Sequence, residues 1–100
     1  FKITAKFPKE EVYSLVSQMR NSSRSVPANI AEGWSKRRYE NLFKKHLTDA
    51  IGSCDEIKVW LDFSLDCNYI DGKIHVELIE EYSKLGKMLF KLLENWKTYA

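Results

Sequence analysis

The residues best suited to chemistry in this chain form a basic cluster with two aromatic neighbours. Five cations fall within ten residues: Lys36, Arg37, Arg38, Lys44 and Lys45. Trp34 and Tyr39 flank the first three of them. Lysine and arginine bind phosphate, and aromatic rings stack on unpaired bases. The combination predicts a face that binds RNA or DNA without reading its sequence.

The same cluster has a structural interpretation, which the residues leave open. It follows Gly33, where one predicted helix ends and the next begins. Cations there complement the dipole of the preceding helix, and Trp34 then packs as a capping residue. Arg20 and Arg24, four residues apart on the preceding helix, extend the basic face if they are exposed; their alternative is a salt bridge with Glu32 or with a neighbouring helix.

Residues that could support catalysis are sparse. His46 and His75 lie on different predicted helices, with no Cys or carboxylate at zinc-ligand spacing. Cys54 and Cys67 are thirteen residues apart, too far for a redox motif, and fit buried thiols better. Neither a phosphate-binding glycine loop nor a nucleophile elbow is present. We therefore expect no enzymatic activity, no metal and no cofactor.

A second candidate surface is apolar and acidic. Trp60 and Phe63 lie beside the main apolar stripe of their predicted helix, with Asp62 and Asp66 nearby. Large aromatic residues outside a core stripe mark an interface about as often as a wider core.

Charge is also divided along the chain, because residues 1–48 carry a net +6 (ten Lys or Arg, four Asp or Glu) and residues 49–100 carry −4 (six against ten). The surface therefore predicts a contact with the basic face of another copy.

The elements that position these residues are predicted from composition. The chain has 100 residues, 44% of them hydrophobic, with four Gly and two Pro. This balance favours one small domain, residues 1–100, built from long helices. No apolar run approaches the ~20 residues that cross a bilayer, and no export signal is evident at the start. Two cysteines do not make a disulfide scaffold, so we expect a cytoplasmic protein without membrane contact.

Apolar periodicity predicts the individual helices. Steps of three and four from Phe43 to Leu65 predict a helix over about 36–68. A second stripe, from Leu78 to Trp96, predicts an antiparallel helix after a short joint in which Asp71 is the N-cap.

The first half of the chain predicts a third long helix. Pro8 fits its first turn, Pro27 is expected to kink it near 23–26, and Gly33 fits its C-terminal cap. Residues 1–7 are expected to be the last turns of an earlier helix. The sequence thus predicts an all-α, antiparallel up-and-down four-helix bundle whose first helix is incomplete in this chain.

Three motifs together resemble a known family. They are 17–20 (SQMR), 29–33 (NIAEG) and 52–53 (GS), within a stretch that extends from Phe7 to about Glu56. The chain resembles the bacterial four-helix-bundle proteins encoded in intervening sequences of 23S rRNA genes, a family related to the accessory proteins of diversity-generating retroelements. Members usually carry a complete first helix, so the resemblance implies that most of that helix precedes residue 1. The segment 34–39 (WSKRRY) departs from relatives, which often have a small residue and fewer aromatics there.

The resemblance also implies assembly and function. It implies a four-helix bundle that forms a ring, typically a pentamer, with a non-enzymatic role beside structured RNA or an RNA–reverse transcriptase complex. Arg20, Asn29 and Glu32 fall on signature positions, where a buried polar network and ligand binding are equally good accounts. The alternative function, from a different class, is a protein–protein scaffold with no nucleic-acid ligand.

Overall fold

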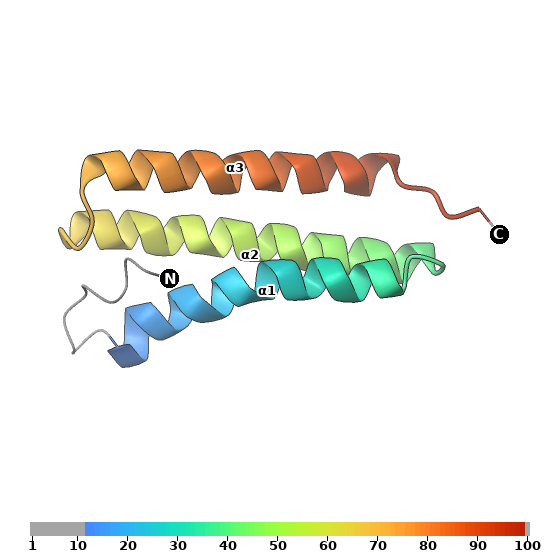
Figure 1. The fold of residues 1–100 in the computed structure, drawn as a ribbon, viewed down its shortest axis with the longest axis horizontal. Coiled ribbons are helices and arrows are strands. Elements are labelled where there is room, and N and C mark those ends of the chain that lie inside the picture. The colour runs from blue at the N-terminus through green and yellow to red at the C-terminus, as the bar shows by residue number, and fades with distance from the viewer. Residues whose placement is uncertain (1–11, 100) are drawn as a thin grey trace.

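The computed structural model describes residues 12–99, and each element among them is a helix. A π-helical turn, η3 (Val12–Val16), leads into α1 (Ser17–Ser35), which is followed by α2 (Glu40–Asp66) and α3 (Gly72–Asn95). Consecutive α-helices run antiparallel and form an elongated body of 51 × 24 × 16 Å (Figure 1). The predicted all-α class is confirmed.

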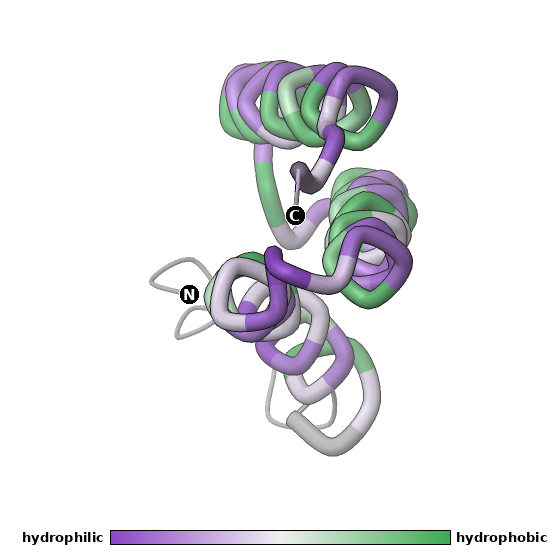
Figure 2. The backbone as a smooth tube through the Cα atoms, turned by 90° about the vertical axis from the view of Figure 1, so that its right-hand side faces the viewer, coloured by the Kyte–Doolittle hydropathy of each residue, from purple (hydrophilic) through white to green (hydrophobic). Residues whose placement is uncertain are grey.

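The helix α2 lies in the middle of the arrangement. It packs along both α1 and α3, whereas α1 and α3 make few direct contacts with each other. Figure 2 shows this in end view, with α1 and α3 on two sides of α2. The earlier helix expected in residues 1–7 lies outside the described residues. Three α-helices are therefore what the described part of the chain shows.

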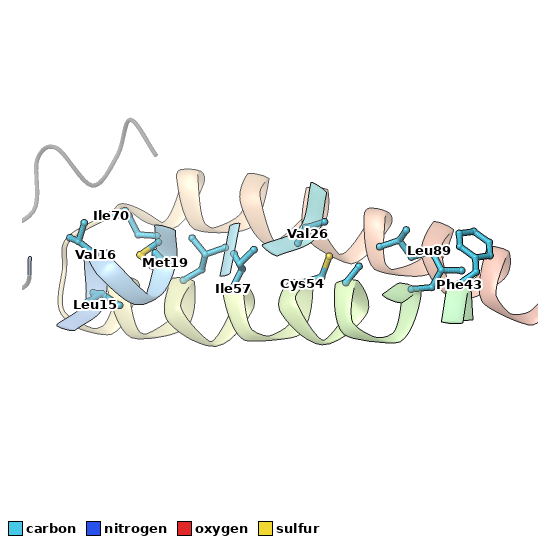
Figure 3. Packing of buried hydrophobic residues seen from close by; sticks show 12 residues of the cluster. Leu15, Val16, Met19, Val26, Phe43, Cys54, Ile57, Ile70 and Leu89 are labelled. Carbon is cyan, nitrogen blue, oxygen red and sulfur yellow. The ribbon is translucent and has the colours of Figure 1, made fainter. Parts of the chain in front are cut away.

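The core follows the apolar stripe of α2, as periodicity predicted. Side chains along this stripe are buried at each successive turn: Phe43, Leu47, Ala50, Cys54, Ile57 and Leu61. From α1, Met19 and Val26 complete this core, and α3 contributes Leu89 (Figure 3). Leu89 is the one residue of α3 that is fully buried among the described residues. The α1–α2 side of the molecule therefore holds most of the core.

The helix boundaries at the α1–α2 turn differ from the prediction. Gly33 was expected to cap α1, but the helix continues to Ser35 and Lys36 is the C-cap. Gly33 is instead buried inside the helix, where α1 passes close to α2. A Cβ at this position would lie 2.8 Å from the His46 Cβ atom, so the close approach of the two helices requires a glycine here. The expected helix start at Lys36 is also wrong, since α2 begins at Glu40 after an extended Tyr39.

The α2–α3 turn follows the prediction more closely. Asp71 is the N-cap of α3, and its side chain accepts a hydrogen bond of 2.8 Å from the Ile74 backbone N–H. Asn68 takes a positive φ of 61°, which reverses the chain after α2. Pro27 lies inside α1 as expected, and Figure 1 shows that α1 changes direction along its length. The expected helix start at Pro8 lies outside the described residues.

Candidate nucleic-acid interface

The α1–α2 turn carries the basic cluster, but most of its lysines already have partners. Three of them pair with carboxylates four residues away: Lys36–Glu32 at 3.1 Å, Lys44–Glu40 at 3.6 Å and Lys45–Asp49 at 3.2 Å. Hydrogen bonding and charge from Lys36 lower the pKa of Glu32 below its usual value. Exposed pairs of this kind contribute roughly 0–1 kcal/mol, so the lysines can exchange partners at little cost. Arg37 and Arg38 form no ion pair with any described residue.

Arg37 and Trp34 form a unit of their own. The Arg37 guanidinium carbon lies 4.3 Å from the centroid of the Trp34 ring, and Nη1 donates a 2.9 Å hydrogen bond to the Trp34 carbonyl. The Trp34 ring also contacts Phe43 and Trp96, with centroid separations of 6.3 and 5.9 Å. Trp34 thus packs against two aromatic rings at this end of the molecule. Both side chains beside the cluster are nevertheless exposed, Trp34 to 52% and Tyr39 to 59%.

The C-terminal segment (Trp96–Tyr99) reaches the same turn. The Thr98 backbone N–H donates to Glu40 Oε1 at 2.8 Å, and Thr98 Oγ1 donates to the Arg37 carbonyl at 2.6 Å. Thr98 Oγ1 also accepts from Trp96 Nε1 at 3.0 Å. The Thr98 N–H lowers the pKa of the Glu40 carboxyl, an effect that partial burial opposes and the Lys44 charge reinforces. Sequence reasoning missed this segment because its partners lie about sixty residues earlier.

An open cavity of about 650 Å³ lies between the turn and the C-terminal segment. Its lining includes three cations and two exposed tyrosines: Arg37, Arg38, Lys97, Tyr39 and Tyr99. Among the described residues that line it, none carries a carboxylate. The cavity therefore offers positive charge and aromatic surface side by side.

Arg20 and Arg24 lie elsewhere. Both are exposed in the first half of α1, and at 1.5 Å per residue Arg24 is about 18 Å along the helix axis from Lys36. Glu32 pairs with Lys36, and no salt bridge of Arg20 or Arg24 to Glu32 or to a neighbouring helix is present among the described residues. The structure does not bring these two arginines to the cavity.

The predicted apolar and acidic surface is only partly brought together. Trp60 and Phe63 line an apolar cavity of about 270 Å³ with Leu15, on the side of α2 that faces η3. Asp62 instead contacts His75 of α3 at 2.7 Å, and Asp66 is exposed at the end of α2. Asp62 is thus engaged with α3 instead of with the two aromatic residues, and the carboxylate beside Trp60 is that of Glu56, which accepts from Trp60 Nε1 at 3.2 Å.

In the part of the chain that the structure describes, no three His, Cys, Asp or Glu side chains are grouped closely enough to hold a metal ion. Within residues 12–99, no helix has the length and hydropathy needed to cross a bilayer. Cys54 is buried, and this burial raises the pKa of its thiol. Cys67 is partly exposed.

Comparison with protein families gives a match over most of the chain. The family described as 23S rRNA-intervening sequence protein matches residues 1–91. The chain belongs to this family. No curated protein and no solved structure gives a match. The predicted resemblance to the intervening-sequence proteins is confirmed.

Two residues on the signature positions of this intervening-sequence protein have structural partners. His46 Nδ1 lies 3.1 Å from Asn29 Oδ1, and Asn29 Nδ2 donates at 3.0 Å to both the carbonyl and the Oγ of Ser25. Ser53 Oγ extends the chain of bonds by donating to Ser25 Oγ at 2.7 Å. This network ties α1 to α2, and Glu32 lies one turn away, bound to Lys36. Arg20 is exposed and outside the network.

The family match and the basic cavity overlap only in part. The α1–α2 turn lies within the matched residues 1–91, whereas the C-terminal segment lies beyond them. The family match therefore does not cover three residues that line the cavity, Lys97, Thr98 and Tyr99. The cavity combines a turn from the family region with a segment outside it.

Proposed function

We propose that this intervening-sequence protein is a non-enzymatic accessory protein that binds RNA or DNA through its basic end, in the cytoplasm. The observation that supports the proposal is the cavity lined by three cations and two exposed tyrosines, without a carboxylate in its described lining. Cations that replace the counterions of phosphates bind nucleic acid without regard to base sequence. Its partners would be structured RNA or an RNA-bound protein such as a reverse transcriptase, as in the retroelement branch.

The proposal also includes an assembly: a fourth helix completes the bundle, and the bundles associate into a ring, with a pentamer preferred. Met88 and Leu92 of α3 are 62% and 38% exposed, and a fourth helix against α1 and α3 would cover apolar residues of this kind. Phe63 is 47% exposed beside Trp60 and offers an apolar contact between copies. Head-to-tail contacts of this kind close into rings when the rotation permits.

A matched pair of variants tests the binding surface. Arg37→Ala with Arg38→Ala removes two charges at the cavity, and Arg20→Ala with Arg24→Ala removes two charges far from it. Binding of RNA and DNA is measured by fluorescence anisotropy at two salt concentrations. The first variant is expected to lower affinity for every sequence and to flatten the slope of log affinity against log salt by about 0.7–0.9 per lost contact. The second variant is expected to stay close to the wild type.

The second candidate function, a protein scaffold, is favoured by a different observation. Lys36, Lys44 and Lys45 are paired within their own helices, and Trp34 packs on its neighbours. If affinity and salt slope are unchanged in the Arg37/Arg38 variant, the cluster serves the turn and the scaffold function is preferred. Light scattering of Trp60→Ala with Phe63→Ala then tests assembly, which should weaken if these residues form the interface. A monomer mass for the wild type at micromolar concentration would contradict the ring.

A further inference from the structure

Both tyrosines of the basic cavity present exposed rings that make no ring contact among the described residues, whereas each of the two tryptophans beside them has ring contacts. Tyr39 is 59% and Tyr99 is 86% exposed, although they come from segments sixty residues apart and line the same cavity. The Trp96 ring packs on Phe43 with a centroid separation of 4.7 Å. Trp34 is 52% exposed, but the Arg37 guanidinium lies over its ring, so Arg37 already occupies the position of a stacked base. Exposed aromatic rings beside cations are the surfaces on which unpaired bases stack.

We propose that the cavity binds an unpaired nucleotide of single-stranded RNA or DNA, with the base stacked on Tyr39 and Tyr99 and the phosphates on Arg38 and Lys97. This inference rests on the proposed function and narrows its ligand from nucleic acid in general to single strands. A cavity of about 650 Å³ is within the usual range of 300–1,000 Å³ for small-ligand sites. A base inside a duplex is already stacked on both faces, so a duplex can contact the cations of the cavity through its phosphates but cannot stack on the tyrosines.

The cations are arranged to leave phosphate sites open. Arg37 is held against Trp34 by its ring contact and by its hydrogen bond to the Trp34 carbonyl. Arg38 and Lys97 line the cavity and form no ion pair with a described residue. One arginine is thus fixed as part of the wall, and the other two cations are available to the backbone of a strand.

The C-terminal segment completes the site only while it is docked. Thr98 holds it by two hydrogen bonds, one to Glu40 on α2 and one to the Arg37 carbonyl in the turn. These bonds bring Lys97 and Tyr99 to the turn from the far end of the chain. Without them the turn would keep Tyr39 and its arginines but lose half of the aromatic surface.

The experiment compares single-stranded and duplex oligonucleotides of the same sequence, about twelve nucleotides long, with the full chain in anisotropy titrations. The variants are Tyr39→Ala and Tyr99→Ala, with Tyr39→Phe and Tyr99→Phe as controls that keep the ring. Both positions are exposed, so the fold should survive the change. We expect tighter binding of the single strand by the wild type. Each alanine variant should lower single-strand affinity about 5- to 150-fold and leave duplex affinity unchanged, and each phenylalanine variant should retain affinity.

The outcomes separate the inference from the proposed function. If single strand and duplex bind alike and the alanine variants match the wild type, while the Arg37/Arg38 variant still loses binding, the stacking site is overturned and the general nucleic-acid function stands. Equal losses for single strand and duplex in the alanine variants would also overturn the stacking site. If no oligonucleotide binds the wild type, both proposals fall together.

Discussion

Each end of this molecule contains a turn between two antiparallel helices, yet the two ends differ in charge. At one end, residues 34–48 carry five cations and one carboxylate; at the other, residues 53–71 carry one cation and five carboxylates. The antiparallel α3 extends the division, since residues 72–83 hold three Glu and one Lys, whereas residues 84–97 hold four Lys and one Glu. Figure 1 places the α1–α2 turn and the end of α3 at one end of the body.

The two turns are also held by different contacts. The acidic turn is local, because Asp71 caps α3 and Asn68 reverses the chain within the same few residues. The basic turn has no side-chain cap on α2 and is bonded instead to Thr98, far along the chain. The acidic turn is therefore held by hydrogen bonds within a few residues and by Ile70 in the core, whereas the basic end depends on a segment about sixty residues away. That dependence joins the cations and aromatic residues from both parts of the chain.

The largest expected effect concerns packing at the basic end. Phe43 is 1% exposed and contacts the rings of Trp34 and Trp96. Phe43→Ala should lower the free energy of unfolding by about 3–5 kcal/mol, since it leaves a cavity under both tryptophans. The matched change Phe63→Ala, at a residue that is 47% exposed near the acidic end, should cost far less. Urea denaturation of both variants measures the difference, and equal losses would contradict it.

The next effect concerns the close approach of α1 and α2 at the basic end. Gly33→Ala should be destabilising, by about 1–3 kcal/mol, because the new Cβ lies 2.8 Å from His46 Cβ. Gly52→Ala is the control, since a Cβ there meets nothing within 4 Å, and it should stabilise α2 by up to about 1 kcal/mol. Thermal denaturation should shift in opposite directions for the two variants. A gain in stability for both would show that His46 yields to the added methyl group.

The same glycine shows what the sequence could and could not predict. A glycine at the end of an apolar stripe fits both a helix cap and a close helix contact, and only the position of His46 on α2 decides between them. The stripe from Phe43 to Leu65 was predictable, because burial against neighbouring helices imposes a period that the sequence carries. The Asp71 cap was predictable for a different reason, because its hydrogen-bond partner is only three residues away.

The C-terminal half of the candidate site could not be predicted from any local pattern in the sequence. Arg37, Arg38 and Tyr39 could be identified from their types and spacing, but the contribution of Thr98 depends on a bond across sixty-one residues. No local pattern encodes such a contact, because it arises only when antiparallel helices of particular lengths bring the segment to the turn. The pairing of Lys44 with Glu40 is different, because the two residues are four apart on one helix and this spacing is visible in the sequence.

A smaller effect is expected at the acidic turn. Asp71→Ala removes the cap of α3 and should cost about 1 kcal/mol, because the Ile74 N–H loses its partner. Asp66→Ala makes the same charge change at the same end, but this carboxylate lies in the last turn of α2, where negative charge opposes the dipole. That control should therefore be neutral or slightly stabilising in urea denaturation. Equal losses would mean that net charge, rather than capping, stabilises the turn.

The smallest expected effect is a pH response of the basic turn. The Thr98 N–H holds the pKa of Glu40 below its usual 4.5, partial burial opposes this shift, and Lys44 adds to it. Because the pKa of Glu40 is lower in the folded protein than in the unfolded chain, ionised Glu40 stabilises the docked C-terminal segment fully above pH 4.5. This stabilisation is lost as the pH falls through the folded-state pKa of Glu40. The NMR shift of the Thr98 amide should therefore change only below pH 4.5. Glu40→Gln keeps an acceptor for Thr98 but has no titration, so its amide shift should stay flat there. A transition above pH 4.5, or one that persists in Glu40→Gln, would assign the response to another group.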